Sequence, residues 1–196
     1  MTKLKFDLHN QLKENISVHE TIIGLSKDII EIIENLQKKI KKGGKILFSG
    51  NGGSAADAQH LAAEFIVRLR PHINRNPIPA ITLAQDTSTL TACGNDFCFD
   101  DIFLRTFRAL ANKNDILFCL STSGNSKNII KVLKEAKKKK IYSVCLLGKG
   151  GGDAKKICDK HLVINSQNTA RIQECHIFLG HFILEKVEDF LMLDKK

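Results

Sequence analysis

The sequence predicts an α/β protein in which a doubly wound, five-stranded parallel sheet follows an N-terminal helical arm. Five short apolar runs do not alternate strictly, and segments of helical spacing separate them. That pattern is typical of parallel strands covered by helices on both faces. Loops rich in glycine or in hydroxyls follow the first and third runs. The length of 196 residues suits one domain with an added helix.

The N-terminal segment 1–42 is predicted to be helical and to end at Gly43 and Gly44. Its apolar stripe is wider than one contact face needs, so we expect this arm to take part in oligomerisation. The stripe consists of Ile22, Leu25, Ile29, Ile32, Leu36 and Ile40, widened by Ile23, Ile30 and Ile33. Residues 43–196 are expected to form the α/β domain.

Within that domain we expect strands at 45–49, 79–84, 115–120, 142–147 and 161–165. The main helices are expected at 54–69, 99–111, 127–139 and 169–192, with a short one after the glycine run 150–152. Right-handed crossovers favour the flavodoxin-like strand order 2-1-3-4-5. The switch point of that order lies between strands one and three, where ligands bind at the carboxyl ends of the strands.

Composition narrows the function classes. No apolar run approaches the roughly 18 residues that span a bilayer, and the N-terminus has no apolar core of a signal peptide, so we expect a cytoplasmic protein without a membrane partner. The net charge of +9 favours an anionic partner. One Tyr, no Trp and no recognition motif argue against nucleic acid. The six cysteines form no CxxC, so free thiols are expected, with a redox or catalytic cysteine as the alternative.

The loop from Ser121 to Ser126 (STSGNS) packs four hydroxyls and a glycine between a predicted strand and a helix start. A helix N-terminus offers unpaired amides and a partial positive charge, and hydroxyls add further donors. The combination predicts a site for a phosphate monoester. The alternative is a serine-capped helix with a polar turn.

The first loop, Gly50 to Ala55 (GNGGSA), also fits the dinucleotide fingerprint G-x-G-x-x-A. That fingerprint requires an acidic residue about 20 positions later. The nearest candidate at a strand end, Asp86, lies more than 30 residues beyond the loop, and the P-loop pattern is absent. We therefore expect no NAD and no ATP.

The helix after this loop carries Asp57, His60, Glu64 and Arg68 at steps of three and four, which place them on one face. His60 and Glu64 can bind one metal ion or act as an acid–base pair, against the alternative of a solvated helix face. In the closing helix, Gln173 and His181 lie among apolar residues. His181 is either a catalytic group or a satisfied core histidine.

Four segments, taken in order, resemble the phosphoheptose isomerase family of the SIS fold. They are 50–65 (GNGGSAADAQHLAAEF), 89–97 (TLTACGNDF), 121–128 (STSGNSKN) and 171–181 (RIQECHIFLGH). The resemblance covers nearly the whole chain. Cys98 departs from the small residue expected after Phe97, which concerns only the local shape of the loop.

The resemblance implies a role for each matching residue. Glu64 would be the catalytic base and would contact substrate, and His181 would be the partner acid. One zinc ion per subunit would be bound by His60, Glu64, Gln173 and His181. The other substrate contacts would be Asn51, Gly52, Gly53, Asn95, Asp96, Ser121, Thr122, Ser123, Ser126 and Gln173.

The family implies conversion of sedoheptulose 7-phosphate to D-glycero-D-manno-heptose 7-phosphate in a cytoplasmic homotetramer, as the first step toward heptose in surface glycans such as lipopolysaccharide or capsule. Such an isomerisation passes through an enediolate and needs a carboxylate base, an acid near the oxygens and a hold on the phosphate. The alternatives are a non-catalytic SIS protein that binds phosphosugars or the replication initiator, and a sugar-phosphate lyase or etherase.

We also expect active sites at subunit interfaces. Gln173 and His181 are eight residues apart, about 12 Å along a straight helix, so ligands from neighbouring chains would meet one ion more easily. The closing helix also has more apolar residues than one contact face needs, which predicts that partner chains cover some of them. Among these residues are Phe182, Val187, Phe190 and Leu191.

Overall fold

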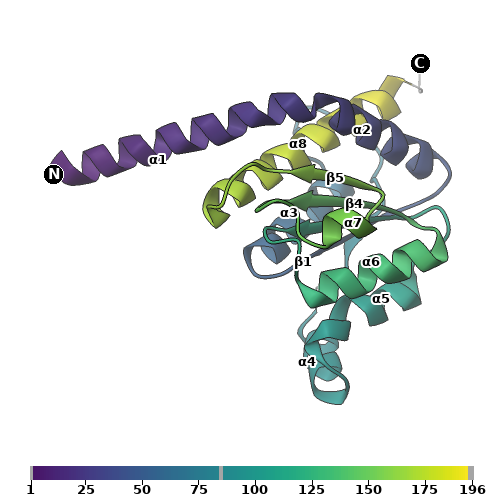
Figure 1. Ribbon diagram of the computed structural model, residues 1–196. Helices are drawn as coiled ribbons and strands as arrows, with labels where there is room; N and C mark the ends of the chain where they lie inside the picture. Colours follow the sequence, from purple (N-terminus) through teal and green to yellow (C-terminus); the bar gives the residue numbers. More distant parts are fainter. Residues whose placement is uncertain (1, 84–85, 194–196) are drawn as a thin grey trace.

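The computed structural model describes residues 2–83 and 86–193. All five strands run parallel, in the order β2-β1-β3-β4-β5. The predicted order is confirmed, and the switch point lies between the carboxyl ends of β1 and β3. Figure 1 shows the sheet with helices on both of its faces.

The strands are β1 (Ile46–Gly50), β2 (Ala80–Thr82), β3 (Ile116–Ser121), β4 (Tyr142–Leu147) and β5 (Lys160–Val163). The helices before β3 are α1 (Thr2–Glu20), η1 (Thr21–Leu25), α2 (Ser26–Lys41), α3 (Gly53–Ile66), α4 (Thr87–Asp96), η2 (Phe99–Asp101) and α5 (Ile102–Leu110). The helices after β3 are α6 (Lys127–Lys139), α7 (Ala154–Ile157) and α8 (Thr169–Leu193).

Two apolar cores cover the two faces of the sheet, because successive side chains of a strand point to opposite faces. On one face Phe48 and Phe118 pack with residues of α2, α3 and α8. On the other face Leu47 and Leu117 pack with residues of α4, α5, α6 and α7. The catalytic candidates of α3 and α8 therefore belong to the first face, and α4 belongs to the second.

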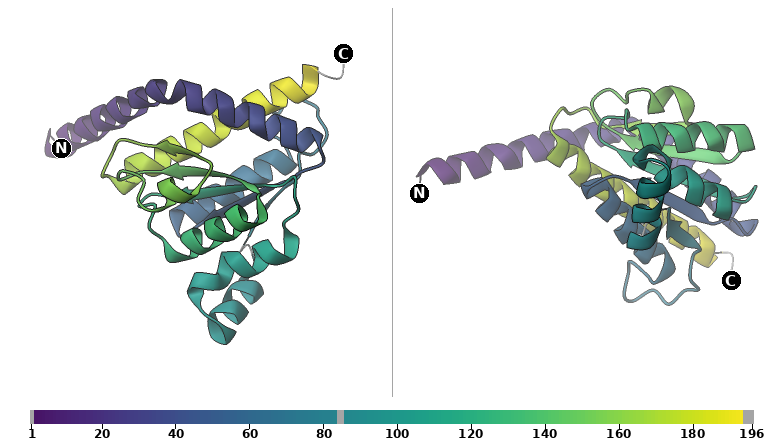
Figure 2. Two further views of the ribbon diagram at one scale, coloured as in Figure 1. Left: turned by 45° about the vertical axis from the view of Figure 1, so that its right-hand side comes forward. Right: turned by 90° about the horizontal axis from the view of Figure 1, so that it is seen from below.

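The N-terminal helix is divided by the 3₁₀ turn η1. α2 packs into the first core, where Ile32 and Leu36 are fully buried. α1 continues beyond the body of the domain, as Figure 2 shows from two sides. Apolar side chains along α1 are between 49% and 75% exposed: Leu4, Phe6, Leu8, Leu12 and Ile16. Within one chain this helix has no core to bury them.

The sequence-based elements differ from the structure at several places. α3 ends at Ile66 rather than near residue 69, because Val67 leaves helical geometry at φ −89° and ψ −84°. α4 was not predicted, although Asp86 supplies an N-cap signal and accepts a hydrogen bond from the Thr89 amide at 2.7 Å. β2 and β5 are shorter than expected, and the predicted end of the second strand at residue 84 lies outside the described residues.

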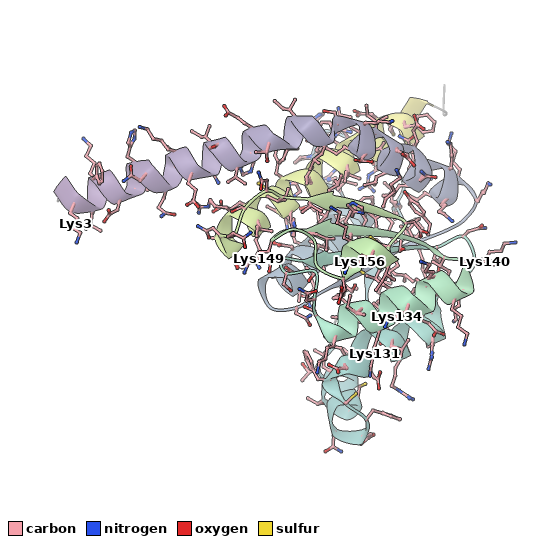
Figure 3. The ribbon with its side chains drawn as sticks, viewed as in Figure 1. Lys3, Lys131, Lys134, Lys140, Lys149 and Lys156 are labelled. Atoms are coloured by element: carbon pink, nitrogen blue, oxygen red, sulfur yellow. The ribbon has the colours of Figure 1, made fainter. Side chains whose placement is uncertain are left out.

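Two lysine runs lie at helix ends. Lys38, Lys39 and Lys41 are in the last turn of α2, and Lys137–Lys139 are in the last turn of α6. Cations in the last turn of a helix favour its dipole. Figure 3 labels Lys131 and Lys134 on α6 and Lys140 at its C-terminal end. All six cysteines are free thiols, and no helix in the described ranges is long and apolar enough to cross a bilayer.

His176 of α8 is fully buried and its two ring nitrogens have no hydrogen-bond partner. Burial lowers its pKa from 6.5 to about 4, and the nearby Leu147 backbone acts in the opposite sense. The unfolded chain takes up this proton first as the pH falls. Stability is therefore complete above about pH 6.5 and is lost as the pH falls toward 4.

We predict that titration of His176 lowers the free energy of unfolding by roughly 2–3 kcal/mol between pH 7.5 and pH 4.5. Denaturant unfolding at both pH values, at one protein concentration, measures this in the native protein and in His176→Leu. The variant should lose about that much less on acidification. Equal losses in the two proteins would show that His176 is not buried in its neutral form.

Candidate active site

Two loops meet at the carboxyl edge of the sheet, because Gly50 of β1 is aligned with Leu120 of β3. The first loop contains Asn51 and Gly52 and leads into α3. The side chains of Asn51 and Asn128 are joined by two reciprocal amide hydrogen bonds, each of 2.9 Å. This pair holds the two loops together. Asn128 was not singled out from the sequence, although a buried Asn in the first turn of a helix was an available signal.

The hydroxyl loop turns tightly before α6. The Ser121 hydroxyl accepts a hydrogen bond from the Gly124 amide at 3.1 Å, and the Ser123 hydroxyl accepts one from the Asn125 amide at 3.2 Å. Ser126 is the N-cap residue of α6, yet its side chain makes no capping hydrogen bond. Thr122 and Ser126 are half-buried. The start of α6 thus places the hydroxyls of Thr122 and Ser126 beside a helix N-terminus, which is a favourable place for an anion.

A glycine-rich segment after β4 supports this loop from outside. Gly124 has φ +66°, and a Cβ built on it would lie 2.0 Å from the Gly151 carbonyl oxygen. The Ala154 amide donates to the Gly124 carbonyl at 2.9 Å, and the Asp153 amide donates to the Asn125 side chain at 3.0 Å. Only glycine combines this backbone conformation with so close an approach. The loop conformation is therefore fixed by its neighbour.

A second cluster lies where α3 packs against α8. A Cβ on Gly180 would be 2.5 Å from the side chain of Leu61, so the two helices approach closely at this point. The approach brings His60 Nε2 within 2.9 Å of His181 Nε2, and Glu64 Oε1 lies 3.6 Å from His60 Nε2. His60, Glu64 and His181 of one chain thus form one cluster. His181 is half-buried and is not a core histidine.

Burial favours the neutral forms of two groups at this place, His181 and Asp57. Burial lowers the pKa of His181, and the neighbouring His60 lowers it further, whereas Glu64 and Glu185 act in the opposite sense. Burial raises the pKa of Asp57, opposed by His60, and Asp57 Oδ2 is buried without a hydrogen-bond partner. A neutral His181 can donate a hydrogen bond at neutral pH through one ring nitrogen.

Gln173 lies apart from this cluster. A Cβ on Gly53 would be 2.5 Å from Gln173 Nε2, so the carboxamide contacts the first residue of α3, two turns before His60. The donor types of His60, Glu64 and His181 are those that zinc takes. However, the 2.9 Å between the two ring nitrogens is a hydrogen-bond distance, whereas ligands about 2.0–2.2 Å from a tetrahedral ion lie roughly 3.3 Å apart. Among residues 2–83 and 86–193, no three His, Cys, Asp or Glu residues are placed to hold a metal ion.

Asn95 and Asp96 lie away from the cluster of His60, Glu64 and His181 in the structure. They end α4, both are exposed, and the Asn95 amide donates to Asp96 Oδ1 at 2.8 Å. α4 packs on the opposite face of the sheet from α3 and α8, as Figure 1 shows. Arg68, expected on the face of His60 and Glu64, follows the end of α3 and is exposed. One chain therefore does not bring these residues to the cluster.

Comparison with known proteins identifies the family. The SIS domain model matches residues 13–148. A phosphoheptose isomerase of Campylobacter concisus is 45% identical over 189 residues, which are 95% of this chain and 97% of the relative. The chain belongs to the phosphoheptose isomerase family. Its fold matches phosphoheptose isomerase GmhA of Neisseria gonorrhoeae (TM-score 0.88, 36% identity, 95% and 99% of the two chains). It also matches a phosphoheptose isomerase of Francisella tularensis (TM-score 0.90, 32% identity, 96% and 100%).

We predict that Gly124→Ala weakens the binding of inorganic phosphate by about tenfold or more, because the new methyl group would push the loop away from residue 151. Isothermal titration measures the dissociation constant. Gly150→Ala is the matched control, since Gly150 has φ +82° but nothing within 4 Å of its added Cβ. Equal phosphate affinity in Gly124→Ala and the native protein would place the phosphate outside this loop.

Proposed function

We propose that this chain is a phosphoheptose isomerase that converts sedoheptulose 7-phosphate to D-glycero-D-manno-heptose 7-phosphate. The observation that carries the proposal is the convergence of Glu64 and His181 around His60 in a member of this family. A carboxylate beside a neutral imidazole is what an aldose–ketose isomerase needs. The product would enter heptose synthesis for surface glycans, in the cytoplasm.

In the proposed reaction, the Glu64 carboxylate removes a proton from C1 of the ketose and returns it to C2. Charge develops on the two substrate oxygens in the enediolate. For the aldose to form, the hydroxyl proton of O1 must also reach O2, and the His181 ring is the proposed carrier of that proton. The lowered pKa of His181 favours the neutral ring, which can donate a hydrogen bond through one nitrogen. Neither step requires NAD or ATP.

The phosphate is proposed to lie at the start of α6, held by Ser121, Thr122, Ser123 and Ser126. Asn51, Gly52, Gly53 and Gln173 are proposed to contact the sugar. Support for this division comes from the Asn51–Asn128 pair, which joins the two loops, and from the contact of Gln173 with Gly53. A phosphate held at the sheet edge would orient the far end of the substrate toward the helices.

Zinc is proposed as the metal, one ion per subunit. His60, Glu64, Gln173 and His181 would hold it, and when bound it would supply Lewis-acid stabilisation of the enediolate oxygens. Their nitrogen and oxygen donors suit this ion. Binding would require the hydrogen bond between His60 and His181 to give way to metal ligation, and the Gln173 side chain to leave Gly53 and reach the cluster.

A homotetramer is the proposed assembly, with the arm 1–42 contributing to it. Support comes from apolar surface that one chain leaves open. A groove of about 310 Å³ between the N-terminal helices and α8 is lined by Ile23, Ile30, Phe178 and Phe182, all at least 38% exposed. The apolar side chains of α1 extend this surface. A second copy of the chain would bury both.

Active sites at subunit interfaces follow from the position of Asn95 and Asp96. We propose that a neighbouring chain supplies them, because α4 lies across the sheet from the cluster of His60, Glu64 and His181. His60, Glu64 and His181 come together within one chain. We therefore propose that neighbouring chains share the substrate contacts rather than these three metal ligands. A regulatory role without catalysis is not favoured by the relatives or by the retention of Glu64 and His181.

We predict that the pure protein converts sedoheptulose 7-phosphate to an aldoheptose 7-phosphate without NAD or ATP. Product NMR in deuterated water should show solvent deuterium at C2, if the base exchanges its proton. A panel of other ketose phosphates serves as the control for substrate choice. Absence of turnover by a folded oligomer supplied with zinc would contradict the assignment.

We further predict that activity returns when Asp96→Ala and His181→Ala chains are co-expressed. About a quarter of sites would then combine an intact cluster with an intact Asp96 from a neighbour, if chains mix at random. Co-expression of Glu64→Gln with His181→Ala is the matched control and should stay inactive, because each cluster comes from one chain. Recovery in the control alone would show that the cluster is shared and that Asp96 serves its own chain.

A further inference from the structure

The connection between α3 and β2, residues 67–79, turns one charged side chain inward. The side chain of Arg75 is only 3% exposed. Its guanidinium donates to the Glu64 carbonyl oxygen at 2.7 Å and to the Phe65 carbonyl oxygen at 2.9 Å. Both carbonyls belong to the last turn of α3. Arg75 thus contacts the main chain of the proposed catalytic base directly.

These contacts meet a need of the helix end. The last four carbonyl groups of an α-helix have no partner within the helix, and a basic side chain can satisfy them and complement the helix dipole. α3 stops abruptly at Ile66, so Glu64 lies in the last turn, whose carbonyl groups have no partner within the helix. The planar guanidinium suits the task, because its several N–H groups can bond two carbonyls and an anion at once.

The anion is Glu188 of α8, whose side chain is fully buried and accepts a hydrogen bond from Arg75 Nε. Glu188 follows His181 by seven residues, which is about 10 Å along the helix and within about 20° of the same face. One helix therefore carries both the proposed acid and the anchor of Arg75. The guanidinium ties the end of α3 to α8 two turns away from the contact between His60 and His181.

We propose that Arg75 is a positioning residue for the isomerase reaction: it fixes the last turn of α3 against α8 and so sets the position of the Glu64 carboxylate relative to His181. The inference rests on the proposed role of Glu64 as base. Arg75 does not touch the substrate in this account. Arg75 acts on proton transfer. If the Glu64 carboxylate is displaced by a fraction of an ångström, proton transfer becomes slower although the substrate still binds.

A purely structural ion pair would behave differently, and Arg70 provides that comparison. Arg70 also contacts Glu188, at 2.9 Å, and its other bonds go to Asp189 and to the Glu185 carbonyl, all on α8. Arg70→Lys therefore disturbs the same buried carboxylate as Arg75→Lys. The Arg75 variant additionally loses a bond to the α3 carbonyls, since an ammonium cannot reproduce the guanidinium fork.

The test measures kcat, KM and the kinetic isotope effect with sedoheptulose 7-phosphate deuterated at C1, together with the thermal midpoint of each variant. Arg75→Lys should lower kcat about tenfold or more, change KM less than about twofold and raise the isotope effect. Arg70→Lys should keep kcat within about twofold and leave the isotope effect unchanged. Equal behaviour of the two variants would overturn the inference.

Glu64→Gln, measured beside them, separates this inference from the proposed function. Turnover near the native level in Glu64→Gln would show that Glu64 is not the base, and would overturn both the proposed mechanism and this inference. An inactive Glu64→Gln with a fully active Arg75→Lys would overturn the inference alone. If Arg75→Lys fails to fold, Glu188→Gln takes its place, because it keeps the size of the anchor but not its charge. A lower kcat with a raised isotope effect supports the inference, and unchanged values overturn it.

Discussion

The close packing of α3 on α8 is the constraint on which the rest of the site depends. Gly180 allows the two helix backbones to approach, and Leu61 fills the space that a side chain would otherwise occupy. That approach places His60 against His181 and brings Glu64 into the same group. If the helices stood farther apart, a histidine and a carboxylate on separate helices would act independently.

The sheet supplies the second half of the arrangement. Parallel strands deliver the loops after β1 and β3 to one edge, and the Asn51–Asn128 pair ties those loops together. The anion binding proposed there would depend on main-chain amides and hydroxyls, and so on the shape of the loop. The proposed proton transfer would depend instead on side chains carried by two helices. In this proposal the phosphate is held at one place and the chemistry takes place at another.

The strand order and the place of the hydroxyl loop between β3 and α6 could be predicted from the sequence, because apolar runs, glycine breaks and hydroxyls before a helix are local patterns. The end of α3 could not, since Val67 and Arg68 fit a helix and only the turn of the following connection interrupts it. The separation of Asn95 and Asp96 from the cluster was also beyond the sequence, because motif order says nothing of which sheet face a helix covers. Arg75 gave no signal, because its partners are main-chain carbonyls and a residue over one hundred positions later.

The central claim is that Glu64 and His181 of one chain act as a unit, and a double-mutant cycle tests it most directly. The values of kcat/KM are measured for the native enzyme, Glu64→Gln, His181→Gln and the double variant, all shown to be folded oligomers. Residues that act together give strongly non-additive losses, so the double variant should be only slightly slower than the worse single variant. Losses that multiply in the double variant would show two independent groups and would contradict the account.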